Sequence, residues 1–203
     1  MTTIVLASGN QKKLRELQAM LATKNVTFVP QTQFNVTEAI EDGLSFVENA
    51  LIKARHASKA TGLPAIADDS GLEVDALNGA PGIYSARFAN IQGAGNSDDA
   101  ANNTLLLEKL RDVPDVQRTA RFQCVLVLMR FPDDPMPLVC QGSWEGQILH
   151  AARGSNGFGY DPLFFVPTHN CASAELAPEI KNSISHRAYA LQQLLVRWPF
   201  ANS

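Results

Sequence analysis

The stretch Ala65-Ile66-Ala67-Asp68-Asp69-Ser70-Gly71 joins a short apolar run to two adjacent carboxylates and a hydroxyl. Such a run predicts a buried β-strand that carries its acids into a cleft. Magnesium takes oxygen ligands and is normally held by one or two carboxylates together with the phosphates of a substrate. The stretch therefore predicts a Mg²⁺ site and a phosphorylated partner, for which the chain must supply phosphate-binding groups elsewhere.

A plainer interpretation of Asp68-Asp69-Ser70 is a helix cap or a turn that ends at Gly71. Two carboxylates side by side repel each other and raise each other's pKa, so a cation or a shared proton is needed to keep both ionised. Glu41, on the polar connection before the next helix, is the candidate third oxygen ligand. The position of both acids directly after an apolar strand makes a metal site as good an interpretation as a cap.

The first part of the chain predicts a strand, a polar turn and a helix. A β-branched apolar run over 3–7 precedes the turn, and Leu14, Leu17 and Leu21 then follow on one helical stripe. Backbone N–H groups at such a helix start, with a lysine in the first turn, are typical of a phosphate site. An ordinary N-cap is the alternative, since the Walker pattern is absent. The candidate phosphate-binding residues are Ser8, Gly9, Asn10, Gln11, Lys12 and Lys13.

A capping box, Ser45-Phe46-Val47-Glu48, predicts a helix over about 46–61 that Gly62 and Pro64 end. Asn49, Lys53 and His56 recur at helical spacing and so share a face, which we expect to meet a ligand.

The remaining pattern alternates strands and helices early and becomes a run of strands later. We expect strands at 26–30, 119–131, 137–144, 146–151 and 163–166, loops over 77–87 and 89–98, a helix ending near Pro114 and a C-terminal helix with Leu191, Leu194 and Leu195. This order predicts an α/β fold around a mixed sheet, with the cleft where strand ends meet loops.

The segment 154–162 contains three glycines and two aromatic residues, Phe158 and Tyr160. Glycine permits close backbone approach, and an aromatic ring between glycines suits stacking with a purine base. Asp161 would then bind the base edge or fix a neighbouring group. A glycine-rich turn between strands is an equally good interpretation of the segment.

Lys181 and Ser185-His186-Arg187 surround the start of the last helix. A solvated basic helix start is the simplest interpretation, but it conflicts with the helix dipole. That conflict suggests an anionic or carbonyl-bearing ligand, which His186 and Arg187 could bind as hydrogen-bond donors.

Composition limits the classes of protein. The 203 residues are 45% hydrophobic and 18% charged, which fits one large domain or two lobes sharing a sheet. The net charge of -3 argues against a general nucleic-acid binder. Neither a signal peptide nor the ~20-residue apolar run of a membrane helix is visible, so we expect no membrane association and a cytoplasmic location. Three cysteines without C-x-x-C spacing predict buried free thiols.

Together these motifs resemble the inosine/xanthosine triphosphate pyrophosphatase family, over nearly the whole chain. The matching patterns are Ser8-x-Asn10-x-x-Lys13, Phe46-x-Glu48-Asn49-Ala50-x-x-Lys53-Ala54, Ala67-Asp68-Asp69-Ser70-Gly71-Leu72, Gly79-Ala80-Pro81-Gly82-x-Tyr84-Ser85-Ala86-Arg87, Phe158-Gly159-Tyr160-Asp161-Pro162 and Ser185-His186-Arg187.

The resemblance implies an elongated mixed sheet with flanking helices, a single domain over 1–203 with two lobes and a cleft between them, and a homodimer. It implies Mg²⁺-dependent hydrolysis of ITP, dITP and XTP to a nucleoside monophosphate and pyrophosphate. Asp69 would be the proton acceptor and, with Glu41, a metal ligand. The triphosphate would bind Ser8 to Lys13, Lys53 and Lys181, with Ser70 also touching substrate. Phe158, Gly159, Tyr160 and Asp161 would hold the base, and His186 and Arg187 would read its six-position oxygen.

Two other functions stay open. One is a pyrophosphatase for modified pyrimidine nucleotides, which the pairing of His186-Arg187 with the Phe158 motif disfavours. The other is a nucleotide-binding sensor without catalysis, which would have no need of the acids Asp68, Asp69 and Glu41.

Overall fold

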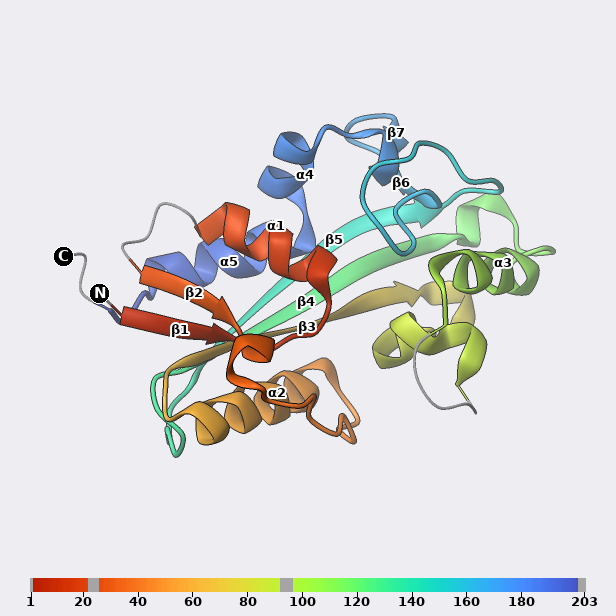
Figure 1. Ribbon diagram of the computed structural model, residues 1–203. Coiled ribbons are helices and arrows are strands. Elements are labelled where there is room, and N and C mark those ends of the chain that lie inside the picture. The colour runs from red at the N-terminus through yellow and green to blue at the C-terminus, as the bar shows by residue number, and fades with distance from the viewer. Residues whose placement is uncertain (1, 22–25, 92–96, 201–203) are drawn as a thin grey trace. The chain divides into compact units, whose positions relative to one another are not determined.

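The computed structural model describes residues 2–21, 26–91 and 97–200, and it has an α/β fold built on one seven-stranded sheet (Figure 1). The strand order is β2-β1-β3-β4-β5-β6-β7. The strands are β1 Thr2–Leu6, β2 Val26–Pro30, β3 Ala65–Val74, β4 Thr119–Met129, β5 Leu138–Ile148, β6 Phe164–Val166 and β7 Cys171–Ala172. The α-helices are α1 Gln11–Leu21, α2 Phe46–Thr61, α3 Asp99–Lys109, α4 Pro178–Ile184 and α5 His186–Val196.

The sheet is mixed, as the sequence predicts. β1 pairs in parallel with β2 and with β3, whereas β6 pairs antiparallel with both β5 and β7. The parallel pairs come from the early strand-helix units, whose helices serve as crossovers.

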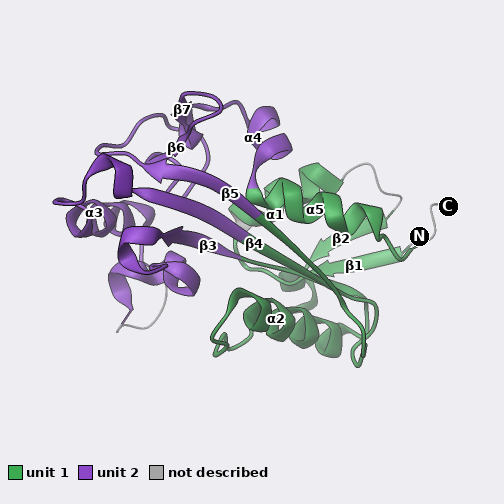
Figure 2. Cartoon of the chain, turned by 180° about the vertical axis from the view of Figure 1, so that it is seen from behind, with its two compact units in different colours: residues 1–69, 124–142, 186–203 green, residues 70–123, 143–185 purple. Residues whose placement is uncertain are grey.

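The chain forms two compact units (Figure 2). The first contains residues 1–69, 124–142 and 186–203, and the second contains residues 70–123 and 143–185. β3, β4 and β5 each contribute residues to both units. The expectation of a single domain stays a prediction.

Two apolar cores lie in the first unit, and strand alternation separates them. Ile4, Leu6 and Ile66 pack in one core with leucines of α1 and α5. Val5, Ala65 and Ala67 pack in the other with alanines of α2. Successive strand residues point to opposite faces of the sheet. The cores that contain Ile66 and Ala67 therefore determine which face Asp68 and Asp69 of β3 point to.

A third core fills the second unit. It joins apolar residues of β3 to those of α3, β4, β5 and β6, with Phe122, Trp144 and Phe164 in mutual ring contact. Of the three free thiols, Cys124 and Cys140 are buried and Cys171 is partly buried.

The capping box of α2 forms as predicted, with one change. The Ser45 Oγ atom accepts a hydrogen bond from the Glu48 amide (3.3 Å), and Gly62 ends the helix in the left-handed conformation. The Glu48 carboxylate accepts from the Leu44 amide (2.9 Å) and from the Ser45 hydroxyl.

Three expectations about the elements are wrong, and two elements were not expected. β3 continues to Val74, so the acids lie within the strand and not at its end. The predicted loop over 77–87 overlaps 3-10 helices, at Asp75–Leu77 and Gly82–Asn90. The predicted separate strand over 146–151 does not form: residues 146–148 are the end of β5, and 149–151 are not in a strand. α4 and the short strand β7 were not predicted, because seven and two residues carry too little periodicity. Half of the loop expected over 89–98 lies outside the described residues, which omit 92–96.

A buried arginine ties α3 to the sheet in the second unit. The Arg118 guanidinium donates hydrogen bonds to the backbone oxygens of Leu110 (2.6 Å), Ile148 (2.8 Å) and Leu149 (2.9 Å). Leu110 is the C-cap of α3, where a positive charge complements the helix dipole. Burial lowers the pKa of Arg118 from its ordinary value.

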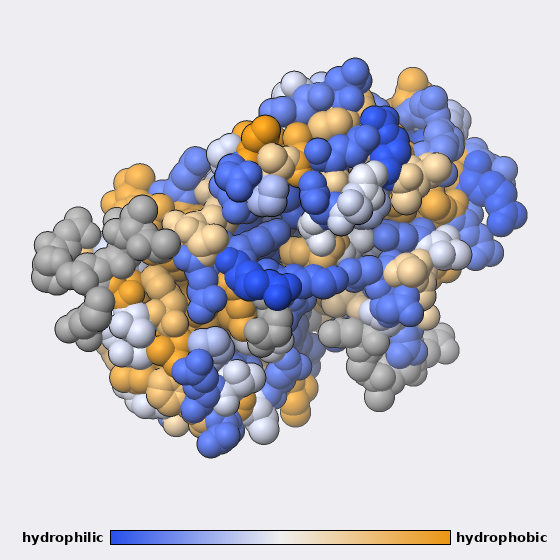
Figure 3. Space-filling view, turned by 45° about the horizontal axis from the view of Figure 1, so that its top comes forward, coloured by the Kyte–Doolittle hydropathy of each residue, from blue (hydrophilic) through white to orange (hydrophobic). Residues whose placement is uncertain are grey.

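Most of the molecular face in Figure 3 is hydrophilic, with hydrophobic residues in smaller groups between the polar ones. The most exposed large apolar side chains include Ile40, Leu44 and Val196. Within the described ranges, every helix is too short or too polar to span a bilayer.

Asp134 should control the acid dependence of stability. Its carboxylate accepts hydrogen bonds from the Arg130 side chain (2.6 and 2.8 Å) and from the Arg130 and Met136 amides (both 3.0 Å), which hold its pKa well below the ordinary 3.8. A lowered carboxyl pKa stabilises the fold above the unfolded-state value of about 4, and the contribution is lost as the pH falls toward the folded-state value. Asp134→Asn should therefore lower the free energy of unfolding at pH 7 and weaken its decline below pH 4. Urea unfolding at pH 7 and pH 3 checks this, and parallel pH curves for both proteins would contradict it.

Candidate active site

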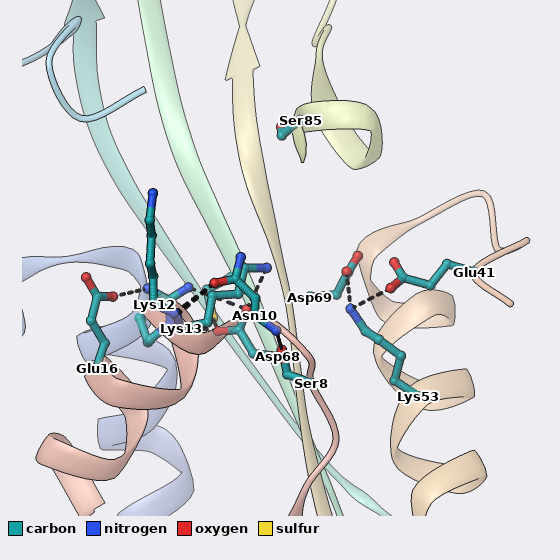
Figure 4. Close-up of polar contacts among 12 residues, drawn as sticks. Ser8, Asn10, Lys12, Lys13, Glu16, Glu41, Lys53, Asp68, Asp69 and Ser85 are labelled. Carbon is teal, nitrogen blue, oxygen red and sulfur yellow. Dashed lines mark hydrogen bonds and ion pairs between the residues drawn. The ribbon is translucent and has the colours of Figure 1, made fainter. Parts of the chain in front are cut away.

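The two adjacent aspartates of β3 serve different sites, because strand alternation sends them to opposite faces. Asp68 follows Ile66 on the face of α1 and α5, and Asp69 follows Ala67 on the face of α2. Figure 4 shows Asp69 directed toward Lys53 and Glu41, with Asp68 on the side of Asn10 and Lys13. The expected pair of carboxylates sharing one cation is therefore corrected to two separate, individually compensated acids.

Asp69, Lys53 and Glu41 form the first cluster. The Lys53 Nζ atom lies 2.6 Å from the Asp69 Oδ1 atom and 3.4 Å from the Glu41 Oε1 atom. The Asp69 and Lys53 side chains are 9% and 12% exposed, whereas the Glu41 side chain is 34% exposed. The structure thus brings together three predicted site residues from β3, α2 and the connection before α2.

This environment shifts the ionisation of both buried partners. Burial raises the pKa of Asp69 above its ordinary 3.8, although Lys53 and Lys13 oppose the shift. Burial acts to lower the pKa of Lys53, but the charges of Asp69 and Glu41 outweigh it and raise that pKa above 10.5. Burial raises the pKa of such a carboxylate, and the neighbouring lysine limits the increase. The carboxylate is therefore ionised but basic enough to accept a proton.

Asp68 is the centre of a second cluster. Its carboxylate oxygens lie 3.1 Å from the Lys13 Nζ atom and 2.7 Å from the Arg187 Nε atom, and the Cys124 thiol donates to it as well. Arg187 also pairs with Glu16 of α1. The Arg187 side chain is 1% exposed.

The basic start of α5 is therefore compensated by protein carboxylates. Asp68 and Glu16 neutralise the charge that Arg187 brings to the helix N-terminus, so the conflict with the helix dipole needs no ligand. His186 is buried beside Arg187 at the first position of α5. The role of both residues in reading a base stays a prediction.

Asn10 organises the start of α1. Its Oδ1 atom accepts hydrogen bonds from the amides of Lys12 (3.0 Å) and Lys13 (3.2 Å), and its own amide donates to the Ser8 Oγ atom (3.1 Å). The ordinary N-cap is thus present, and it places two lysines in the first turn of the helix. Gly9 lies against Glu38, since a Cβ atom there would meet the Glu38 carboxylate. Gln11 begins the helix, and its side chain lies outside the description.

The expected ligand-facing surface of α2 is only partly correct. Lys53 meets the acids, but the Asn49 side chain is buried and accepts a hydrogen bond from the Gly43 amide (2.9 Å). The His56 Nε2 atom lies 2.9 Å from the Thr37 carbonyl oxygen. Both residues hold the connection that carries Glu41.

The second unit contains the remaining predicted residues around Asp161. One Asp161 oxygen accepts hydrogen bonds from the Phe158 amide (2.8 Å) and the Lys181 ammonium (2.6 Å), and the other accepts from the Ser173 hydroxyl (2.8 Å). The Lys181 Nζ atom also lies 5.1 Å from the centre of the Phe158 ring. Asp161 therefore fixes its neighbours, and its contact with a base edge stays a prediction.

Tyr160 connects the same turn to the 3-10 helix Gly82–Asn90. Its buried hydroxyl donates to the Ser85 carbonyl oxygen (2.8 Å), and burial raises the pKa of Tyr160 well above 10. The Ser85 hydroxyl in turn accepts from the Leu72 amide of β3 (2.9 Å). Ser70 precedes Leu72 in the strand and is half-buried.

Sequence reasoning missed three members of these clusters, Glu16, Cys124 and Ser173. Their partners lie 171, 56 and 12 residues away in the chain. No local spacing signals such pairs. The period-2 pattern of β3 could have separated Asp68 from Asp69 if the strand had been extended beyond Ala67.

The carboxylates suit a metal that also uses ligands from a substrate. The described residues hold no group of three or more His, Cys, Asp or Glu side chains that could bind an ion unaided. Glu41 and Asp69 supply oxygen ligands within reach of the same ammonium group, which is the chemistry of a site completed by phosphates and water.

An α/β fold with acids and lysines at a mixed sheet defines a class of phosphate-handling proteins, and comparison with known proteins gives the family. A family model described as the Ham1 family matches residues 4–197, and the chain belongs to this family. A Vibrio cholerae protein named dITP/XTP pyrophosphatase is 61% identical over 194 residues, covering 96% of this chain and 95% of its own length. A Pseudomonas syringae protein of the same name is 60% identical over 197 residues, covering 97% of each chain.

Solved structures agree with this assignment. A HAM1 protein from Coxiella burnetii is similar with a TM-score of 0.88 and 53% identity, over 97% of this chain and 98% of that one. The Ham1 protein of Staphylococcus aureus is similar with a TM-score of 0.83 and 40% identity, over 97% of both chains.

Proposed function

We propose that the protein is a pyrophosphatase for non-standard purine nucleoside triphosphates, which it hydrolyses to the monophosphate and pyrophosphate. The observation that carries the proposal is the buried carboxylate of Asp69 held 2.6 Å from the Lys53 ammonium, with Glu41 on the same lysine. The names of relatives about 60% identical over nearly the whole chain support ITP, dITP and XTP as substrates.

Asp69 is the proposed proton acceptor. It takes a proton from a water molecule whose oxygen attacks the α-phosphorus, and the bond from that phosphorus to the bridging oxygen breaks. Pyrophosphate leaves with the bonding electron pair. The raised pKa of Asp69 supports this role, since a stronger base accepts the proton more readily.

The proposed positive charge that holds the triphosphate comes from lysines of three helices, α1, α2 and α4. Lys12 and Lys13 stand at the start of α1 beside Ser8, Gly9, Asn10 and Gln11, and Lys53 reaches from α2. Lys181, the fourth lysine of the proposal, belongs to the second unit and is paired with Asp161. Fixed positive groups that meet the departing pyrophosphate stabilise the charge that develops on it.

Mg²⁺ is the proposed cofactor, with Asp69 and Glu41 as its protein ligands. When bound, it would neutralise charge on the phosphate oxygens. The two-carboxylate set fits this ion, which keeps several waters and takes its other ligands from phosphates.

The base is assigned to the turn Phe158-Gly159-Tyr160, with Asp161 fixing that turn and Ser70 contacting substrate. Hypoxanthine and xanthine carry a six-position oxygen where adenine carries an amino group. Donors at this position, predicted to be His186 and Arg187, would leave adenine facing donor to donor, at a cost on the order of 10⁴-fold in rate. GTP also carries a six-position oxygen, so its rejection needs a steric or polar clash with the amino group at the two position of guanine.

The proposal also includes a homodimer and a cytoplasmic location.

Substrate comparison tests the proposal. With Mg²⁺, the purified protein should convert ITP and XTP to monophosphate and pyrophosphate, and ATP, GTP and dTTP much more slowly. Activity mainly on modified pyrimidine triphosphates would move the protein to that other class of pyrophosphatase. Tight binding of ITP without turnover would make it a sensor.

A further inference from the structure

Helix α3 holds the glycine at the centre of the Phe158–Tyr160 turn by both of its main-chain polar groups. The Gly159 amide donates to the Asp99 Oδ2 atom (3.0 Å), and the Gly159 carbonyl oxygen accepts from the Asn103 Nδ2 atom (3.0 Å). Asp99 and Asn103 are four residues apart in α3, so they lie on one face in successive turns. The helix is therefore joined to the turn by two hydrogen bonds.

The conformation of Gly159 explains why both of its backbone groups are hydrogen-bonded to α3. Gly159 has a φ of +61°, in the left-handed region that residues with side chains adopt reluctantly. Without a side chain, it can be fixed in place only through its backbone. Phe158 and Tyr160 flank this glycine, so the position of its backbone affects the course of the turn that carries both residues.

The helix is itself fixed to the rest of the second unit. The Asn102 side chain accepts a hydrogen bond from the Ala89 amide (2.8 Å), and the Asp98 side chain caps the helix by accepting from the Ala101 amide (2.6 Å). The chain of contacts thus runs from the 3-10 helix Gly82–Asn90 through α3 to Gly159.

Asn103 is unfavourable for the stability of the fold, because one of its polar atoms is buried without a partner in the described part of the chain. Its Oδ1 atom is buried and has no hydrogen-bond partner among the residues that the structure describes. A buried acceptor without a partner is unfavourable. Reversing the amide would set Oδ1 against the Gly159 carbonyl oxygen, so the bond to Gly159 dictates the orientation that leaves this atom unmatched.

We infer that Asp99 and Asn103 are positioning residues that set the discrimination between purine bases by fixing the Phe158–Tyr160 turn. The inference rests on the proposed function, in which this turn holds the base. Both residues act through Gly159. Their loss should weaken binding of the base while leaving the acids of the first unit unchanged.

Steady-state kinetics of Asp99→Ala, Asn103→Ala and the double variant test the inference, with ITP and GTP as substrates. Loss of one such hydrogen bond should raise KM for ITP by about tenfold, while kcat changes by less than about threefold. The preference for ITP over GTP should fall in parallel. Because both bonds hold one glycine, the two effects should not be additive. Asp99→Asn, which keeps an accepting oxygen, should restore much of the ITP affinity.

Asp98→Ala is the matched control, since Asp98 neighbours Asp99 and its side chain caps the helix by accepting from the Ala101 amide. It should lower the melting temperature by roughly 2–4 °C and leave KM and base preference unchanged. If Asp98→Ala moves KM and preference as much as Asp99→Ala, the effect is helix stability and the inference is wrong. Unchanged KM in both alanine variants at 99 and 103 would also overturn it.

Hydrogen exchange separates this inference from the proposed function. Amide exchange of a peptide spanning Gly159 should speed up in Asp99→Ala and Asn103→Ala but not in Asp98→Ala, whether or not the wild type hydrolyses ITP. Faster exchange without ITP turnover in the wild type would refute the proposed function and the role in base choice. Unchanged exchange with normal ITP turnover would refute the inference alone.

Discussion

Asp69→Asn should lose about 10³-fold or more in kcat for ITP while keeping the wild-type fold, because loss of a general base typically costs 10²- to 10⁴-fold. Asparagine has nearly the same shape as aspartate, so the packing of β3 beside α2 should survive. The neutral amide cannot take the proton of the attacking water, and it no longer offsets the charge of Lys53, 2.6 Å away. Turnover measured at saturating ITP, with circular dichroism to verify the fold, checks this.

Two further variants sharpen the result. Asp133→Asn makes the same chemical change at a side chain that is 87% exposed, and should leave turnover unchanged. Glu41→Gln removes a proposed metal ligand and one of the two carboxylates beside Lys53, but it leaves the proposed base in place. Raising the Mg²⁺ concentration should therefore restore much of its activity but none of that of Asp69→Asn. Near-normal turnover by Asp69→Asn would sink the assignment of Asp69 as the base.

Arg187→Met should lower the free energy of unfolding by about 3–5 kcal/mol, because it leaves buried carboxylates without their main cation. The guanidinium lies 2.7 Å from Asp68, whose side chain is 3% exposed, and it also pairs with Glu16. Adding Asp68→Asn to this variant should recover part of the loss, since it removes the buried negative charge that has lost Arg187 and keeps Lys13. Urea denaturation of the two single variants and the double variant gives the coupling between the residues.

Arg121→Met provides the comparison. Arg121 also pairs with two carboxylates, Asp75 (2.8 Å) and Glu145 (3.0 Å), but these are 45% and 67% exposed. Pairs in contact with water contribute little, so this variant should lose at most about 1 kcal/mol. If Arg121→Met and Arg187→Met lower the free energy of unfolding equally, burial of the Asp68 ion pairs does not increase their contribution to stability, and the prediction is wrong.

The strand and helix patterns were most informative where the periodicity was long. α2 was predicted from its capping box and its glycine stop, and it forms over Phe46–Thr61. The sequence places the end of β3 too early because three polar residues, Asp68, Asp69 and Ser70, interrupt the apolar run. Asp68 and Asp69 can nevertheless lie inside a strand, because Lys13 and Lys53 neutralise them. α4 is too short to carry a periodic signal.

The sequence names the residues of the candidate site but not the contacts among them. Lys53 and Asp69 were named from their chemistry, yet only the fold shows that Lys53 binds Asp69 while Lys13 binds Asp68. The partnership of Arg187 with Glu16 joins residues 171 positions apart, which no spacing rule reaches. Asp99 and Asn103 gave no sequence signal, because side chains that bind backbone groups resemble ordinary helix surface.

Hydrolysis of ITP in ¹⁸O-labelled water, with mass spectrometry of the products, is the most direct test of the proposed chemistry. Attack of a water activated by Asp69 on the α-phosphorus predicts one labelled oxygen in the inosine monophosphate and none in the pyrophosphate. Label in the pyrophosphate, or release of orthophosphate in place of pyrophosphate, would contradict the account.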